Sequence, residues 1–234
     1  LTHPALAGRT GRGISVAVVD SGINPAHPHV GGVGGGVWIA RDGRDAEDGE
    51  EYVDVLGHGT AVAAAIHEKA PDAQLFAVRV FEQTLATNAG LLVRAIDWAA
   101  SRGIRLINLS LGTAKAEREV LLQGAVERAA SRGALIVSAA EHAGERRLPG
   151  SLAGVIGVVL DWDCPRDELR LGVQAGGRPV LRASGYPRPI PGVPSERNLH
   201  GISFAVANAT AFVALLLEGR PDVATPEDVL QLLG

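Results

Sequence analysis

The sequence predicts an α/β fold with a mostly parallel central sheet and helices on both of its faces. Short, wholly apolar runs recur along the chain, as expected for strands that are covered on both faces. Helical stretches lie between these runs, and two of them end at Arg102-Gly103 and Arg132-Gly133, where a basic residue followed by Gly favours a helix end. This alternation of strands and helices is typical of a parallel sheet.

The expected elements follow one another along the whole chain. Strands are predicted at 14–19, 75–80, 106–109, 134–137 and 155–160, and helices at 60–66, 89–101, 117–131 and 203–217. A last helix is expected after Thr225, because Thr225 can act as N-cap, Pro226 fits the first helical position and Asp228 is an acid at the third. Residues 161–198 are rich in Pro, Gly and Arg and predict loops and irregular strands.

Length and composition predict a single domain over residues 1–234. A chain of this length with 46% apolar and 21% charged residues can bury a sizeable core without a disulfide or metal. The net charge of −4 argues against a nucleic-acid-binding protein with a broad basic face. The longest apolar stretch, 202–217, falls short of the ~20 residues of a membrane span.

The compartment stays open on the sequence alone. The one cysteine, Cys164, excludes an intrachain disulfide, which fits a reducing compartment and equally a secreted bacterial protein without disulfides. Cys164 is expected to be a bystander in a loop. The first residues show no signal peptide, and the missing initiator Met indicates that the N-terminus has been trimmed.

Three motifs place reactive side chains where active sites form. Asp20 follows a predicted strand, and the carboxyl ends of parallel strands are where such sheets gather their active residues. His58 lies between two glycines at a helix start, and Ser203 begins the buried apolar helix. A serine becomes nucleophilic when an imidazole accepts its proton and a carboxylate orients that imidazole. The N–H of Ser203, at a helix start, suits an oxyanion.

Taken singly, each motif is more often a cap or a turn, but together they resemble a family. DSG at 20–22, GHGT at 57–60 and GISFA at 201–205 resemble, in this order, the three motifs of the subtilisin-like serine proteases. The segment 13–28 resembles the family's first strand and loop, and NLSLG at 108–112 resembles the segment lining its substrate cleft. The resemblance covers almost the whole chain and implies a serine endopeptidase with Asp20, His58 and Ser203 as its triad.

The resemblance also implies how a substrate is held. Ser110, Leu111 and Gly112 are expected to pair with the extended backbone of a peptide or protein substrate by strand addition. Leu56, beside the histidine motif, is a further expected substrate contact. No cofactor is required. The short loops indicate a selective processing protease, for which a removed prodomain or a partner domain is expected.

The sequence departs from the family at three places. His142 stands where the family usually carries an asparagine as the second oxyanion donor, so its ring N–H is the candidate replacement. The serine motif lacks the usual Thr before Ser203 and the usual Thr-Pro after it. In the shortened loop that follows His142, Arg146 or Arg147 is a candidate to favour an acidic residue before the cleaved bond, with a solvated surface arginine as the alternative.

Further alternatives stay open. The acidic stretch 42–54 offers oxygen ligands for calcium, although its spacing is not that of an EF-hand and such runs are usually solvated loops that can steer basic substrates. A catalytically weak or inactive domain that binds or scaffolds a peptide or partner protein is the main rival function. A nucleotide-binding module is disfavoured, because Gly8, Gly11 and Gly13 precede the first strand rather than follow it.

Overall fold

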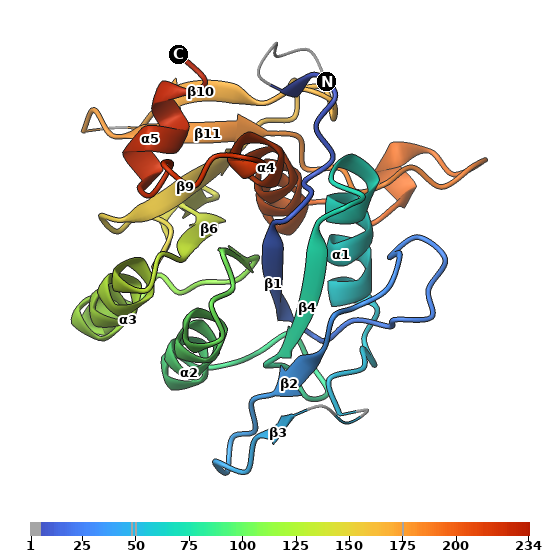
Figure 1. The fold of residues 1–234 in the computed structure, drawn as a ribbon, viewed down its shortest axis with the longest axis vertical. Coiled ribbons are helices and arrows are strands. Elements are labelled where there is room, and N and C mark those ends of the chain that lie inside the picture. The colour runs from blue at the N-terminus through green and yellow to red at the C-terminus, as the bar shows by residue number, and fades with distance from the viewer. Residues whose placement is uncertain (1–5, 48, 50, 175) are drawn as a thin grey trace.

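The computed structural model describes residues 6–47, 49, 51–174 and 176–234. Its centre is a nine-stranded sheet of order β10-β11-β9-β6-β5-β1-β4-β2-β3, in which neighbours from β11 to β2 run parallel and the two edge pairs run antiparallel (Figure 1). The strands are β1 Ser15–Asp20, β2 Gly36–Trp38, β3 Ala46–Glu47, β4 Gln74–Arg79, β5 Leu106–Leu109, β6 Leu135–Ala139, β9 Val155–Leu160, β10 Arg170–Val173 and β11 Pro179–Ala183. A separate hairpin pairs β7 Glu141–His142 with β8 Glu145–Arg146.

Helices cover both faces of this sheet. The helices are α1 His58–Lys69, α2 Ala89–Ser101, α3 Glu119–Ser131, α4 Ile202–Leu217 and the short α5 Pro226–Gln231. One apolar cluster combines α1 and α4 with Val16 and Val18 of β1, and a second combines α2 and α3 with Ala17 and Val19. Alternate β1 side chains therefore enter opposite layers, which explains its unbroken apolar sequence. The predicted fold class is confirmed.

The longest helix, α4, is buried along almost its whole length. Every residue from Phe204 to Leu217 is buried, and the helix contacts β5, β6, β9 and β11 as well as α1. Because its surroundings are apolar on all sides, its sequence is apolar on all sides. None of the described helices is long and apolar enough to cross a membrane.

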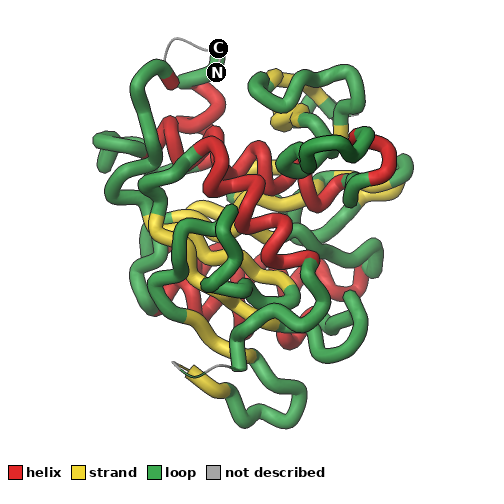
Figure 2. The backbone as a smooth tube through the Cα atoms, turned by 90° about the vertical axis from the view of Figure 1, so that its right-hand side faces the viewer, coloured by secondary structure: helices red, strands yellow, loops and turns green. Residues whose placement is uncertain are grey.

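The sequence missed the short elements at the edges. β2 and β3 were not predicted: β2 begins at Gly36, the last residue of a glycine run, and gains its strand character by pairing with β4. The run predicted as loops and irregular strands contains β10 and β11. Helix α1 begins at His58, two residues earlier than predicted, and continues to Lys69. Loops form much of the surface in the side view of Figure 2.

Candidate active site

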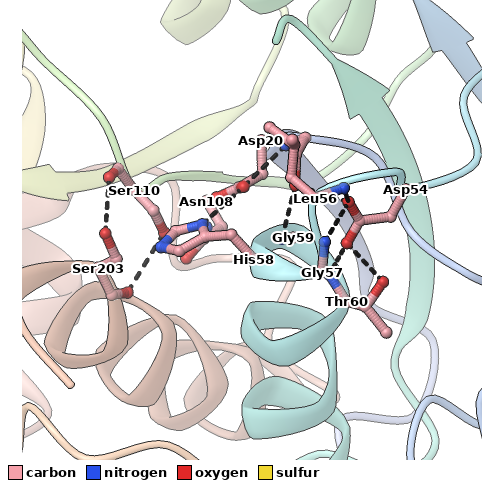
Figure 3. A network of polar contacts seen from close by, with 11 residues as sticks. Asp20, Asp54, Leu56, Gly57, His58, Gly59, Thr60, Asn108, Ser110 and Ser203 are labelled. Carbon is pink, nitrogen blue, oxygen red and sulfur yellow. Dashed lines mark hydrogen bonds and ion pairs between the residues drawn. The ribbon is translucent and has the colours of Figure 1, made fainter. Parts of the chain in front are cut away.

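Asp20 and His58 form a hydrogen-bonded pair between β1 and α1. Asp20 is the last residue of β1 and is fully buried, and His58 is the first residue of α1. His58 Nδ1 lies 2.7 Å from Asp20 Oδ1, which also accepts the N–H of Ser21 at 2.7 Å (Figure 3). Asp20 Oδ2 is buried and has no hydrogen-bond partner among the described residues. His58 Nδ1 is thereby held by a carboxylate that water does not reach.

Gly59 allows this close approach of α1 to the end of β1. A Cβ atom at Gly59 would lie 2.1 Å from the carbonyl oxygen of Gly22 and 3.1 Å from Asp20 Cβ. Any larger residue would push the helix away and lengthen the bond between Asp20 and His58. On the other side of His58, Gly57 has φ of 82°, a left-handed conformation that favours glycine. The two glycines that flank His58 are therefore needed for different reasons, Gly59 for space and Gly57 for its backbone conformation.

The surroundings of His58 favour its protonated form. Burial of the imidazole lowers its pKa, but the hydrogen bond and charge of Asp20, together with the charge of Asp54, outweigh burial. The pKa of His58 is therefore raised above its ordinary value. A base held in this way stabilises the imidazolium that forms when it takes a proton from a serine.

Ser203 lies in the first turn of α4, bonded to Ser110. The Ser203 hydroxyl donates to the Ser110 carbonyl at 3.2 Å, and the Ser110 hydroxyl donates to the Ser203 carbonyl at 3.3 Å. Within the described ranges, no hydrogen bond joins Ser203 Oγ to His58, although the ring of the next residue, Phe204, lies 5.7 Å from that of His58. In Figure 3 the imidazole lies between Asp20 and Ser203. Ser203 N–H, in the first helical turn, has no intrahelical acceptor.

A buried polar chain supports Ser110 from behind. Thr210 Oγ1 on α4 donates to Asn108 Oδ1 at 2.9 Å, and Asn108 Nδ2 donates to Ser110 Oγ at 2.8 Å. Asn108 and Thr210 are completely buried. Asn108 belongs to the segment 108–112 that was expected to line the substrate cleft, but its support of Ser110 through Thr210 was not predicted. A polar residue inside an apolar run is the signal that could have found this contact.

The expected substrate edge, Ser110 to Gly112, directly follows β5. Beyond it, Thr113 and Leu148 exchange two backbone hydrogen bonds of 2.9 and 2.8 Å, which fix the end of this segment. Gly112 lines a cavity of about 320 Å³ together with Thr87, Asn88, Ala89, Gly90, Leu92, Thr113, Lys115 and Arg118. Leu56, the other expected contact, is 37% exposed. A second cavity, of about 440 Å³, lies beside the start of α1 and includes Gly57, Thr60 and Leu199.

The oxyanion and specificity candidates have different surroundings. His142 ends β7 and is exposed. Arg146 points to α3, where it makes two bonds of 2.8 and 3.0 Å to Glu119. Arg147 lies beside the substrate edge, since a Cβ on Gly112 would be 3.9 Å from Arg147 Cβ, and its guanidinium bonds Glu145 at 3.1 Å. Of the two arginines, only Arg147 is placed near the expected cleft.

The acidic stretch forms ion pairs and caps. Asp42 pairs with Arg44, Asp45 with Arg94 and Glu47 with Arg102. Two further acids of the stretch, at positions 48 and 50, lie outside the described residues. In the part of the chain that is described, no group of three or more His, Cys, Asp or Glu side chains is placed to hold a metal ion.

Asp54, the last acid of this stretch, is a site residue that the sequence analysis missed. Its carboxylate accepts the N–H groups of Leu56, Gly57 and Thr60 at 2.8 to 2.9 Å, at the start of α1 (Figure 3). Partial burial raises the pKa of Asp54, but the hydroxyl of Thr60 and these N–H groups outweigh burial, so the pKa is lowered. Asp54 lies three residues before Gly57, which caps α1. An acidic residue at this distance before a helix start is the sequence signal that could have identified it.

Cys164 lies outside these contacts. It is buried in the loop after β9, and its thiol approaches the carbonyl oxygens of Pro165 and Glu168 at 3.6 Å. Burial raises the pKa of the thiol, so the nucleophilic thiolate is disfavoured.

Comparison with known proteins shows to which family this chain belongs. A sequence model of the Subtilase family matches residues 11–159, more than half of the chain, including Asp20, His58 and the segment 108–112. The chain belongs to the subtilase family. This subtilase is 34% identical to M-protease of Shouchella clausii over 229 residues, which is 92% of the chain and 56% of that protein. It is also 34% identical to Subtilisin E of Bacillus subtilis over 152 residues, 60% of the chain and 38% of that protein.

Solved structures show the same fold. A cold-adapted subtilisin-like serine proteinase superposes with a TM-score of 0.73 at 22% identity, covering 96% of this subtilase and 82% of that chain. Sphericase gives 0.71 at 24% identity, covering 95% and 82%. The residues matched by the family model end before Ser203. This subtilase spans only about half, or less, of the full length of the two curated relatives above.

Proposed function

We propose that this subtilase is a serine endopeptidase that cleaves peptide bonds through an acyl-enzyme. Ser203 Oγ attacks the peptide carbonyl carbon while His58 Nε2 takes its proton, and His58 then gives that proton to the leaving amine. Water hydrolyses the resulting ester with His58 again as base. The observation that carries the proposal is the 2.7 Å contact of His58 Nδ1 with buried Asp20, because it leaves Nε2 free to accept the serine proton.

The remaining parts of the reaction have candidates nearby. Ser203 N–H supplies one oxyanion donor and His142 is the proposed second one. The Ser203 hydroxyl must turn from the Ser110 carbonyl to His58 before attack, which breaks one neutral hydrogen bond of 3.2 Å. Catalytic hydrogen bonds often tighten only when substrate binds. No step of this reaction requires a cofactor.

The proposed substrate is an extended segment of a peptide or protein. Its backbone would add as a strand to Ser110, Leu111 and Gly112, with Leu56 as a further contact, which gives affinity with little dependence on side chains. Selectivity would then come from Arg147, which favours an acidic residue before the cleaved bond once it leaves Glu145. A peptide library that shows no acidic preference at that position would remove Arg147 from the site.

One observation favours a second candidate function. Because Ser203 is bonded to Ser110 and His142 is exposed, the domain is also a candidate for binding or scaffolding a peptide with little turnover. A prodomain or partner domain would then be the segment held on the substrate edge.

Labelling with a fluorophosphonate, read by intact mass, separates the two functions. The unmodified protein is expected to gain one adduct, and Ser203→Ala none, because only an activated serine reacts. His58→Ala should label far more slowly, because it lacks the base that activates Ser203. A triad without one of its members keeps a rate enhancement of only about 10³–10⁴-fold over the reaction in water. A folded protein that gains no adduct would favour the binding function.

A further inference from the structure

Asp54 receives more hydrogen bonds than the catalytic carboxylate itself. Besides the three N–H groups at the start of α1, it accepts the hydroxyls of Ser21 at 2.9 Å and Thr60 at 2.6 Å. Oδ1 takes Ser21, Leu56 and Gly57, and Oδ2 takes both groups of Thr60. All five partners are donors, so both oxygens must act as acceptors.

The two hydroxyls turn this carboxylate into a cross-link between strand and helix. Ser21, which follows β1, donates to Asp54 and accepts the N–H of Gly59 in α1 at 2.9 Å. Thr60, in α1, donates to Asp54 and accepts the N–H of Asn24, beyond β1, at 3.0 Å. Because a hydroxyl has one proton, the demand of Asp54 for protons sets the direction of both bonds. The Ser21 hydroxyl therefore binds the backbone of α1, and the Thr60 hydroxyl binds the backbone beyond β1. Asp54 orients both hydroxyls for these contacts.

The cross-link encloses the catalytic pair. Ser21 is the neighbour of Asp20, and Gly59 and Gly57 flank His58, so the bonded residues lie on both sides of the contact between the two catalytic side chains (Figure 3). We propose that Asp54 is a positioning residue that fixes the start of α1 against the end of β1 and so holds the His58 imidazole on Asp20. This inference rests on the proposed triad, to which it adds a second, supporting carboxylate.

The contacts require a carboxylate rather than an amide. An asparagine at this position would turn an NH₂ group toward at least two donors in either orientation of its amide. The substitution would break the cross-link while leaving the side-chain volume almost unchanged. It would also remove one of the two negative charges that raise the pKa of His58, the other being that of Asp20.

The experiment compares Asp54→Asn with Asp42→Asn and with the unmodified full chain. Asp42 belongs to the same acidic stretch but is exposed and bonds only Arg44 among the described residues, so its variant controls for loss of one charge. We expect Asp54→Asn to lower kcat/KM and the fluorophosphonate labelling rate about 10²-fold through misplacement of His58. Asp42→Asn should change neither.

The pH profile gives a readout that a merely structural role would not move. Neutral His58 is the working base, so activity is lost as the pH falls through its pKa. Losing the Asp54 charge lowers that pKa, and the acid limb of Asp54→Asn should therefore shift to lower pH. An NMR titration of the His58 ring should show the same downward shift. Because loss of the Asp54 charge alone lowers this pKa, the same titration on Ser21→Ala, which keeps the charge, tests positioning: a downward shift there means that the imidazole has moved away from Asp20. The titration needs no turnover, so it tests the inference even if the proposed peptidase activity fails.

Two outcomes would overturn the inference. One is an Asp54→Asn variant whose His58 titration and labelling rate both match those of the unmodified protein. The second outcome concerns Ser21→Ala, which is used if circular dichroism shows that Asp54→Asn does not fold. Ser21→Ala keeps the Asp54 charge and removes only the hydrogen bonds of the Ser21 hydroxyl. Its labelling rate should fall about tenfold, and a rate equal to that of the unmodified protein would remove Asp54 from a positioning role.

Discussion

The two halves of the candidate active site differ in how firmly the described structure holds them. Asp20 and His58 are joined directly at 2.7 Å, and the backbones around them are tied together through Asp54. Ser203 instead donates to a backbone carbonyl, at 3.2 Å, and the candidate oxyanion donor His142 is exposed at the end of a two-residue strand. One half is fixed before substrate arrives, and the other must rearrange.

Under the proposed peptidase function, this difference predicts which half of the site limits the rate. The base is preorganised, so it contributes without reorganisation at the moment of reaction. In the proposed reaction the substrate completes the arrangement of Ser203 and the oxyanion donors, and this half is therefore where the proposed enzyme would respond to the correct peptide. Substitutions in the first half should therefore act on kcat for every substrate, whereas those in the second half should act unequally on different substrates.

The largest effect is expected for Asp20→Asn. The amide cannot hold the imidazole in the tautomer that leaves Nε2 as the acceptor, and such a change costs about 10⁴ in kcat in a serine protease triad. Steady-state hydrolysis of a chromogenic peptide measures it. Asp97→Asn, which loses an exposed pair with Arg128, is the matched control and should keep full activity. A loss for Asp20→Asn no greater than that of the control would mean that the first half is not the catalytic base.

A smaller effect is expected for His142→Ala. One oxyanion donor typically contributes ~10²–10³ in kcat, and an exposed donor competes with water, so we expect a loss near the lower bound. His142→Asn supplies the amide that the family usually carries and should restore or raise kcat. A kcat unchanged in His142→Ala would remove His142 from the site and leave Ser203 N–H as the proposed donor.

The sequence predicted the parts of the molecule that apolar runs and short motifs determine. Buried strands such as β5 and β9, and helix α2, have the predicted bounds, because burial on both faces or a strong cap leaves little freedom. Asp20, His58 and Ser203 lie where the sequence placed them, at a strand end and two helix starts, and the motifs around them carried the resemblance to the family. The fold and the chain order of the motifs were therefore accessible.

The supporting contacts were not accessible, because they depend on conformations that no local pattern fixes. The role of Asp54 requires the left-handed turn at Gly57 and the close approach allowed by Gly59, which join segments far apart in the chain. Neighbouring arginines could not be told apart either. Arg146 and Arg147 point to different partners, Glu119 and Glu145, and that choice is set by the pairing of β7 with β8.

The smallest effect is expected for the buried polar chain that supports Ser110, and it tests whether this chain helps to position Ser203. Thr210→Val keeps the side-chain shape but leaves the buried Asn108 Oδ1 without its donor, which costs about 1–3 kcal/mol of folding free energy. Through Ser110 it should also slow fluorophosphonate labelling severalfold. Asn208→Ala is the control, because Asn208 is buried on the same helix but donates to the carbonyls of Ser184 and Tyr186 instead. Both variants should melt at lower temperature, and only Thr210→Val should label more slowly. Equal labelling rates in the two variants would mean that Asn108 and Thr210 stabilise the fold without placing Ser203, and that the nucleophile is held by its own helix alone.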